Sequence, residues 1–416
     1  MKFVGDFHIH SKYSRAVSPL MDLENLDRWA KIKGIKVMGT GDFTHPKWFE
    51  SITKELEPAE PGLFKLHGES FGTRFLLTAE ISCIYKKLGK VRKVHIIIFA
   101  PSIEAVEKIN DKLNKIGNLH SDGRPILGLD AKELAKIVLE ADENCMVIPA
   151  HAWTPWFAIF GSKSGFDSIE ECFDDYSKYI YAIETGLSSD PEMNWRLSQL
   201  DKITLISNSD AHSPRKIGRE ANVFDTELSY AGITDAIKSK DKSKFLYTIE
   251  FFPEEGKYHF DGHKDCSLSL SPEESKKYNN ICPKCAKPLV IGVLNRVAKL
   301  ADREQGFRPE NAIPYKSLIP LEEVIAESLG VTTASKQVGK YYNSLITNVG
   351  SEFKILLDSE RKEIEKESLS EIAEGIIRMR EGKVSIEPGY DGVYGKIKLF
   401  PDKEKKEKSY PQKTLL

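Results

Sequence analysis

The pattern of apolar and polar positions divides the chain into two parts. Over roughly the first 225 residues, short apolar or β-branched runs alternate with amphipathic stretches. Repeated strand–helix units predict a parallel sheet covered by helices, and about seven of them favour a barrel over an open sheet. The predicted strands are 2–9, 35–40, 75–82, 93–100, 145–150, 179–184 and 203–208.

Residues 22–33 carry the clearest helical signal. Asp22 is a suitable N-cap, and Gly34 can end the helix in a left-handed conformation. The residues that share one face at helical spacing are Leu23, Leu26, Trp29, Ala30 and Lys33.

The pattern changes near residue 250. A stretch rich in turn formers is followed by helical periodicity over 321–329, 335–347 and 360–380, and a short strand pattern over 383–400. We therefore expect four parts. They are a barrel over 1–245, a zinc-binding module over 246–300, a mainly helical domain over 301–402 and a flexible tail over 403–416.

Composition adds little to this picture. The 416 residues include 60 Lys and Arg against 62 Asp and Glu, so net charge neither indicates nor excludes a nucleic-acid partner. No apolar run reaches the roughly 18 residues of a membrane span, and the N-terminus does not resemble a signal peptide. We expect a cytoplasmic protein without a membrane partner.

Imidazoles and carboxylates gather at the ends of the predicted strands. In "DFHIH", two histidines lie at i and i+2 of a strand and would point to the same side. A single buried histidine is better explained as part of the core, but eight such residues favour a metal centre, and they are too many for one ion. They are His8, His10, Asp42, Glu80, His95, His151, Asp210 and His212.

The segments "DFHIH", "GTGDF", "TAE", "VHIIIF", "PAH" and "SDAH" resemble the successive motifs of the PHP (polymerase and histidinol phosphatase) family. This resemblance implies a distorted (β/α)7 barrel and a trinuclear metal centre that hydrolyses phosphate esters. Within the family, the chain is most similar to the endonuclease Q proteins, archaeal DNA-repair nucleases with a zinc module and a helical C-terminal part. Two positions depart from the family pattern. Ala16 replaces a further histidine, and Thr40-Gly41-Asp42 replaces T-D-H.

The resemblance implies two or three divalent ions, Zn, Mn or Mg. We expect His8 and His10 at the first ion, and His95 with His151 at the second. Glu80 and Asp210 would be shared as the catalytic carboxylates, since a carboxylate can span two ions. The third ion would rest on Asp42 and His212.

A second cluster predicts a structural zinc site. His263 and Cys266 form one pair, and Cys282 and Cys285 the other, at zinc-ribbon spacing. Four protein ligands leave no open position, and His259 is an alternative to His263. A redox role for Cys282 and Cys285 would require a thioredoxin-like βαβ context, which the sequence lacks.

Three functions are compatible with these features. The resemblance favours a DNA endonuclease that cuts 5′ to hypoxanthine, uracil, xanthine or abasic sites, with double- or single-stranded DNA as its partner. The resemblance does not decide whether a sliding clamp or another repair protein is a further partner. The alternatives are a small-molecule phosphoesterase, which has little use for a zinc module, and a non-catalytic DNA-binding scaffold.

Reading a base inside a duplex requires that it be flipped out of the stack. The aromatic loop after His151 is the predicted place for this contact. Its candidate residues are Trp153, Trp156, Phe157 and Phe160, and the alternative is that these rings pack the loop onto the barrel.

Overall fold

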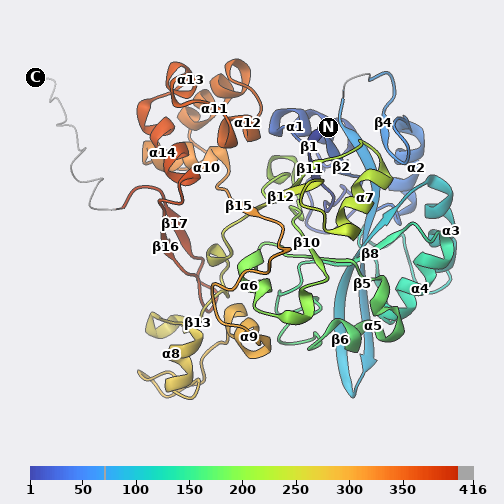
Figure 1. The fold of residues 1–416 in the computed structure, drawn as a ribbon, viewed down its shortest axis with the longest axis horizontal. Coiled ribbons are helices and arrows are strands. Elements are labelled where there is room, and N and C mark those ends of the chain that lie inside the picture. Colours follow the sequence, from blue (N-terminus) through green and yellow to red (C-terminus); the bar gives the residue numbers. More distant parts are fainter. Residues whose placement is uncertain (70–71, 402–416) are drawn as a thin grey trace, which may run out of the picture.

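The computed structural model describes residues 1–69 and 72–401 (Figure 1). The predicted tail, 403–416, lies outside the described residues. A mixed sheet dominates the N-terminal part. Its strands are β1 (Lys2–Asp6), β2 (Val37–Gly39), β3 (Leu56–Pro58), β4 (Phe64–Leu66), β5 (Arg74–Lys87), β6 (Lys90–Ala100), β7 (Ile126–Leu127), β8 (Met146–Pro149), β11 (Ala221–Asp225), β12 (Phe245–Glu250) and β15 (Tyr315–Ser317).

All seven predicted barrel strands form, and they follow one another around a ring. β1, β2, β5, β6 and β8 pair in that order, and β9 (Ala182–Glu184) pairs with β10 (Thr204–Ile206). Single backbone contacts close the ring. The Ala152 amide donates to the Glu184 carbonyl at 2.9 Å, and Ile9 bridges to Ala211.

The predicted parallel sheet is wrong for β6, and antiparallel pairings also join β3, β4 and β5 and join β1, β11 and β12. β5 and β6 form an antiparallel hairpin in which Ser82 faces His95, and β6 is also antiparallel to β8. β6 therefore runs against its neighbours, and its middle, at His95, lies at the rim where β5 carries Glu80.

Helices cover the outside of this sheet (Figure 1). The helix predicted over 22–33 forms with the predicted caps. The Asp22 side chain accepts a hydrogen bond from the Asn25 amide, and Gly34 is left-handed at φ 87°. The covering helices are α1 (Leu23–Lys33), α2 (Pro46–Glu55), α3 (Ile103–Leu113), α4 (Ala131–Ala141), α5 (Ile169–Phe173), α6 (Pro191–Trp195) and α7 (Tyr230–Ser239).

Apolar side chains fill the interior of the ring, and polar ones follow them on the same side. Side chains two residues apart share one face of a strand, so an apolar interior position predicts the direction of its neighbour two steps on. The buried pairs that follow this rule are Ile97 with His95 and Ala182 with Glu184, and on β5 the apolar Leu76 is followed on the same side by Thr78 and Glu80. The interior of the barrel thus becomes polar at one rim.

The remaining chain lies to one side of the barrel (Figure 1). A small module contains β13 (Asp261–His263), β14 (Leu268–Leu270), α8 (Pro272–Lys277) and α9 (Val293–Leu300). A helical part follows. Its elements are α10 (Leu321–Leu329), α11 (Lys336–Asn348), α12 (Glu352–Leu357), α13 (Arg361–Glu367), α14 (Ser370–Arg380), β16 (Ser385–Glu387) and β17 (Lys396–Lys398).

Two details differ from the predicted organisation. The sheet continues past residue 245 through β12 and takes β15 from the region expected to be helical. The helix predicted over 360–380 is broken because Ser368 is extended and its hydroxyl donates to the Ile364 carbonyl at 2.8 Å.

In the described part of the chain, no helix is long and apolar enough to span a membrane.

Candidate metal centre

Two groups of potential metal ligands meet at the polar rim of the barrel. One group is His8, His10 and Asp210, and the other is Glu80, His95 and His151. Within each group the ligand atoms lie within 4.8 Å of one another.

Glu80 lies between the two groups. Its Oε2 is 3.3 Å from His10 Nε2, while its Oε1 is 2.7 Å from His95 Nδ1 and 3.1 Å from His151 Nε2. Burial alone would raise the pKa of Glu80, but His95, His8 and Arg124 hold it well below its usual range, so the group is a carboxylate. The two ligand groups therefore share one buried negative charge.

The backbone is strained where it delivers three residues to this rim. Asp42, His151 and Asp210 have φ values of 48°, 29° and 45°, in the left-handed region that side chains rarely adopt. Each follows a strand, and the turn directs the chain around the end of the barrel. Such strain often marks a functional site.

Glu184 orients His8. Both of its carboxylate oxygens lie 3.0 Å from His8 Nδ1, which leaves Nε2 turned towards the centre. The same carboxylate accepts hydrogen bonds from the His151 amide at 2.8 Å and from Asn208 Nδ2 at 2.9 Å. Glu184 therefore positions residues of both groups, a role that the sequence analysis did not predict.

Asp42 has the same relation to His10, and it belongs to neither group of potential ligands, so its predicted role as a ligand stays a prediction. Its Oδ1 is 2.9 Å from His10 Nδ1, and its Oδ2 accepts from the Ser11 amide, the Ser11 hydroxyl and the Ser14 hydroxyl. With both oxygens occupied behind the ring, Asp42 holds His10 in place and does not face the centre.

His212 joins neither group. Its Nδ1 lies 2.8 Å from the Asp210 carbonyl, and its ring centre is 4.9 Å from that of His10. The side chain is 36% exposed, so it stands at the open edge of the centre.

The donor set fits divalent metal ions. His8 Nε2, His10 Nε2 and Asp210 Oδ1 are buried, and none makes a hydrogen bond within the described residues. His10 Nε2 and Asp210 Oδ1 lie 3.2 Å apart, within ion-pair distance. Buried polar atoms that lack a hydrogen bond cost free energy, and three that face one space are satisfied together by a cation. Burial lowers the pKa of His95 to about 4, which keeps its imidazole in the neutral form that binds metals.

Arg124 is a further residue that the sequence analysis missed. Its Nη1 lies 3.1 Å from Glu80 Oε2, and its side chain is 27% exposed. The preceding residue, Gly123, lets the loop that carries Arg124 lie close to Asp42, because a Cβ at position 123 would be only 2.3 Å from Asp42 Oδ2. An isolated arginine in a loop carries no sequence pattern that marks it as part of a site.

The aromatic loop separates into buried and accessible rings. Trp153 and Phe160 are buried, their ring centres are 4.9 Å apart, and Trp153 Nε1 donates to Asn194 Oδ1 at 2.8 Å. These two rings pack the loop onto the barrel and cannot stack on a base. Trp156 is 51% exposed, and Phe157 lies 4.7 Å from the His95 ring.

The four predicted zinc ligands also come together. Ligand atoms of His263, Cys266, Cys282 and Cys285 lie within 4.8 Å of one another, whereas His259 is not in this group. The apolar cluster around them is small, with Leu270, Cys282 and Leu289 as its buried members. A module with so little core would be stabilised by a metal ion held between these four residues.

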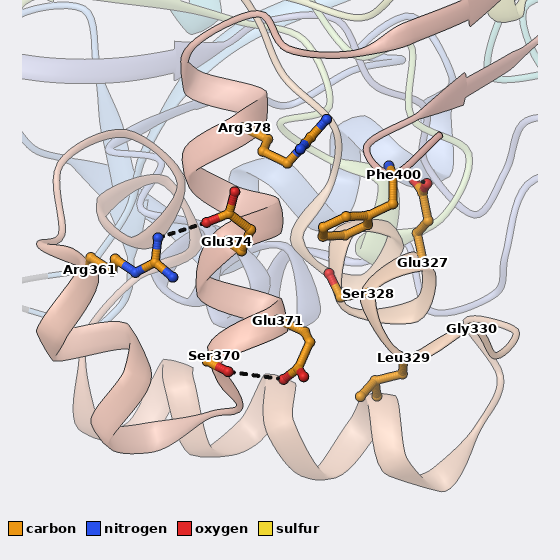
Figure 2. A pocket seen from close by; sticks show the side chains of 10 residues that line it. All are labelled: Glu327, Ser328, Leu329, Gly330, Arg361, Ser370, Glu371, Glu374, Arg378 and Phe400. Carbon is orange, nitrogen blue, oxygen red and sulfur yellow. Dashed lines mark hydrogen bonds and ion pairs between the residues drawn. The ribbon is translucent and has the colours of Figure 1, made fainter. Parts of the chain in front are cut away.

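Among the cavities of the described residues, two have volumes above 500 Å³. One of about 590 Å³ adjoins the centre and is lined by Thr154, whose hydroxyl is 3.2 Å from His151 Nδ1, by Arg219, which donates to the Asp210 carbonyl, and by His259. The other, about 510 Å³, lies among α10, α13 and α14 (Figure 2). There Arg361 faces Glu374 at 2.7 Å, so charges of the lining already pair with each other.

Comparisons with known proteins identify relatives of this chain. The family model of the MJ0043 C-terminal domain matches residues 320–383. An uncharacterized protein of Methanocaldococcus jannaschii, MJ0043, is 36% identical over 262 residues, which make up 61% of this chain and 32% of that protein. The chain thus spans about a third of the length of this curated relative.

Two solved structures match over nearly the whole chain. The lesion-specific endonuclease PfuEndoQ from Pyrococcus furiosus has a TM-score of 0.86 at 33% identity, covering 98% of this chain and 97% of that one. A structure of endonuclease Q in complex with a 27-mer duplex bearing an abasic lesion at the active site has a TM-score of 0.84 at 33% identity, covering 97% and 98%. The chain belongs to the endonuclease Q family.

Proposed function

We propose that this protein is a metal-dependent DNA endonuclease that hydrolyses the phosphodiester bond 5′ to a deaminated or damaged base. The observation that carries the proposal is the position of Glu80 between two groups of buried ligands whose free atoms face one space. The likeness of the whole chain to a lesion-specific endonuclease supports it. A sliding clamp or another repair partner stays a prediction.

The two groups would hold two divalent ions, with Glu80 shared between them, and a third would draw on His212. Bound there, such ions stabilise negative charge on phosphate oxygens and lower the pKa of water. Asp42 and Glu184 orient the imidazoles of His10 and His8, so that the ligand set is preorganised. Arg124, partly exposed beside Glu80, is placed to bind a phosphate oxygen.

The cavity of about 590 Å³ would receive the flipped base. It adjoins both ligand groups, through Thr154 at His151 and Arg219 at Asp210. His259 Nδ1 is buried and has no hydrogen-bond partner among the described residues, so it is free to read a base edge. Burial lowers the pKa of His259 to about 4, which leaves a neutral ring that can donate or accept.

Cleavage mapping tests this proposal. End-labelled duplexes with a single hypoxanthine, uracil, xanthine or abasic site, and an undamaged duplex, are incubated with the protein and Mg²⁺ or Mn²⁺. We expect one cut 5′ to each lesion and none in the undamaged duplex, and His10→Ala or Asp210→Ala should abolish cleavage but not DNA binding. Hydrolysis of small phosphate esters with no cut in any duplex would instead favour the phosphoesterase alternative.

A further inference from the structure

The β5–β6 hairpin carries cationic side chains with no acidic residue among them. From residue 81 to residue 103 the sequence has five lysines and arginines and no aspartate or glutamate. The whole protein carries a net charge of only −2, so this concentration is local. In Figure 1 the hairpin projects beyond the helices that cover the barrel.

Two of the five cations fasten the hairpin to the body of the protein. Lys87 Nζ donates to the Cys172 carbonyl at 2.8 Å and to Asp174 at 3.0 Å. Arg92 is buried, donates to the Gly165 carbonyl and lies 4.1 Å over the Phe166 ring. These contacts hold the hairpin in a fixed orientation.

The other three cations do not attach the hairpin to the body of the protein through ion pairs. Lys86, Lys90 and Lys93 form no ion pair within the described residues, and Lys86 and Lys90 are exposed. Lys93 lies 5.1 Å over the exposed Trp156 ring and 5.3 Å over Phe157, which connects the hairpin to the loop beside the centre. Unpaired cations on a rigid, projecting element fit a polyanion.

The hairpin is also in the right place for the substrate. It is the continuation of the two strands that carry Glu80 and His95, so it rises from the rim where the ligand groups meet. Lys87 is seven residues beyond Glu80, a distance of about 24 Å at about 3.4 Å per residue. At about 3.4 Å per base pair, that length corresponds to roughly seven base pairs of a duplex.

We propose that the β5–β6 hairpin, through Lys86, Lys90 and Lys93, binds the phosphate backbone of duplex DNA to one side of the nucleotide held at the metal centre. This inference rests on the proposed nuclease function and adds to it a contact surface outside the centre. These phosphate contacts would increase the affinity for duplex DNA and fix its position along the protein, but they would not depend on the base sequence.

A double variant, Lys86→Ala with Lys90→Ala, tests the proposal, because both side chains are exposed and remote from the ligand groups. Anisotropy with a labelled duplex bearing an abasic site, without added Mg²⁺ or Mn²⁺, should give a Kd raised roughly tenfold at 0.15 M salt, and a log Kd against log salt slope reduced by about 1.8. In cleavage assays KM should rise while kcat stays unchanged. Shortening the duplex on the hairpin side should weaken wild-type binding but add little to the variant.

The matched control is Lys115→Ala with Lys136→Ala, which removes the same charge from exposed positions near and on the covering helices α3 and α4. It should leave Kd, the salt slope and KM unchanged, and both double variants should keep the wild-type melting temperature. If the wild type cuts lesion duplexes while the hairpin variant binds them with unchanged Kd and slope, the hairpin role is overturned and the nuclease function stands. If the wild type neither binds nor cuts any duplex, both proposals fail.

Discussion

Four carboxylates at one rim, three of them buried and that of Asp210 partly exposed, differ in what their oxygens face. Both oxygens of Glu80 face imidazole nitrogens of the two ligand groups, and Asp210 Oδ1 lacks a hydrogen bond. The oxygens of Asp42 and Glu184 are filled by donors on the outer side of the histidines. The first two are therefore suited to bind ions, and the other two to orient ligands.

The substitution Asp42→Asn tests this division. The amide keeps the shape of the side chain but loses the negative charge beside His10 Nδ1, so metal affinity should fall by about 10- to 100-fold. Activity titrated against Mn²⁺ should recover at high metal concentration. Asp210→Asn, the matched change at a residue facing the centre, should not recover. Wild-type metal affinity in Asp42→Asn would contradict a positioning role.

The two kinds of ring in the aromatic loop give a second prediction. Trp153→Ala empties a buried position and should lower the free energy of unfolding by about 3–5 kcal/mol, measured by urea titration. Trp156→Ala removes an exposed ring and should change it by less than about 0.5 kcal/mol. If Trp156 stacks on the flipped base, its loss should reduce incision at hypoxanthine more than at an abasic site, which has no base.

Equal losses on both substrates for Trp156→Ala and for Phe157→Ala would exclude base stacking by this loop. The cavity lined by Thr154, Arg219 and His259 would then be the remaining candidate for base contact.

The residues of the centre could be predicted because their types and their places at strand ends are visible in sequence. All six members of the two groups were among the predicted ligands, and the structure brings them together, while their binding of metal stays a prediction. Which atom of each side chain faces inward is set by packing between distant segments. That is why the position of Asp42 behind His10, and the roles of Glu184 and Arg124, were not predicted.

At the scale of elements, periodicity predicted where strands and helices lie better than it predicted their direction. A two-residue period is the same for parallel and antiparallel strands. The segment between 82 and 93 held a usable signal, since about ten residues are too few for a helical crossover, and Leu88-Gly89 can form a tight turn. The antiparallel hairpin explains why His95, in the middle of β6, lies beside Glu80, in the middle of β5, although the predicted strands placed one at a beginning and the other at an end.

The small module provides the prediction at this scale. Cys282→Ser removes one of four closely spaced ligands, so elemental analysis should find about one zinc fewer per chain than in the wild type. Because the apolar cluster is small, the segment over 261–291 should also become sensitive to proteolysis. Cys145→Ser, at a thiol in the barrel, is the control. Unchanged zinc content in Cys282→Ser would contradict the site.

At the scale of the whole molecule, specific polar contacts join the parts of the chain. Arg296 of α9 donates to the Phe160 and Phe166 carbonyls, which connects the small module to the aromatic loop. Arg215, beyond β10, contacts Glu322 of α10 at 2.6 Å. The predicted domain boundary at residue 245 is also less distinct than expected, because β12 and β15 continue the barrel's sheet.

A further contact between the barrel and the helical part is a buried ion pair, which gives the last prediction. Lys33, at the end of α1, contacts Glu352 of α12 at 2.7 Å, and the two side chains are only 7% and 4% exposed. Glu352 also accepts hydrogen bonds from the Leu321 amide and the Tyr342 hydroxyl, so it organises the start of α10. Lys33→Met would leave this carboxylate buried without its cation, at a cost of about 3–5 kcal/mol.

The cost should appear in urea unfolding as a lower midpoint, or as an early transition if the helical part separates from the barrel first. Lys54→Met is the matched control. Lys54 pairs with Glu50 on the surface of α2, where both side chains are more than half exposed, and the change should stay within about 0.5 kcal/mol. If Lys33→Met unfolds like the wild type, the pair does not hold the helical part against the barrel, and apolar packing of Phe353 and its neighbours must do so instead.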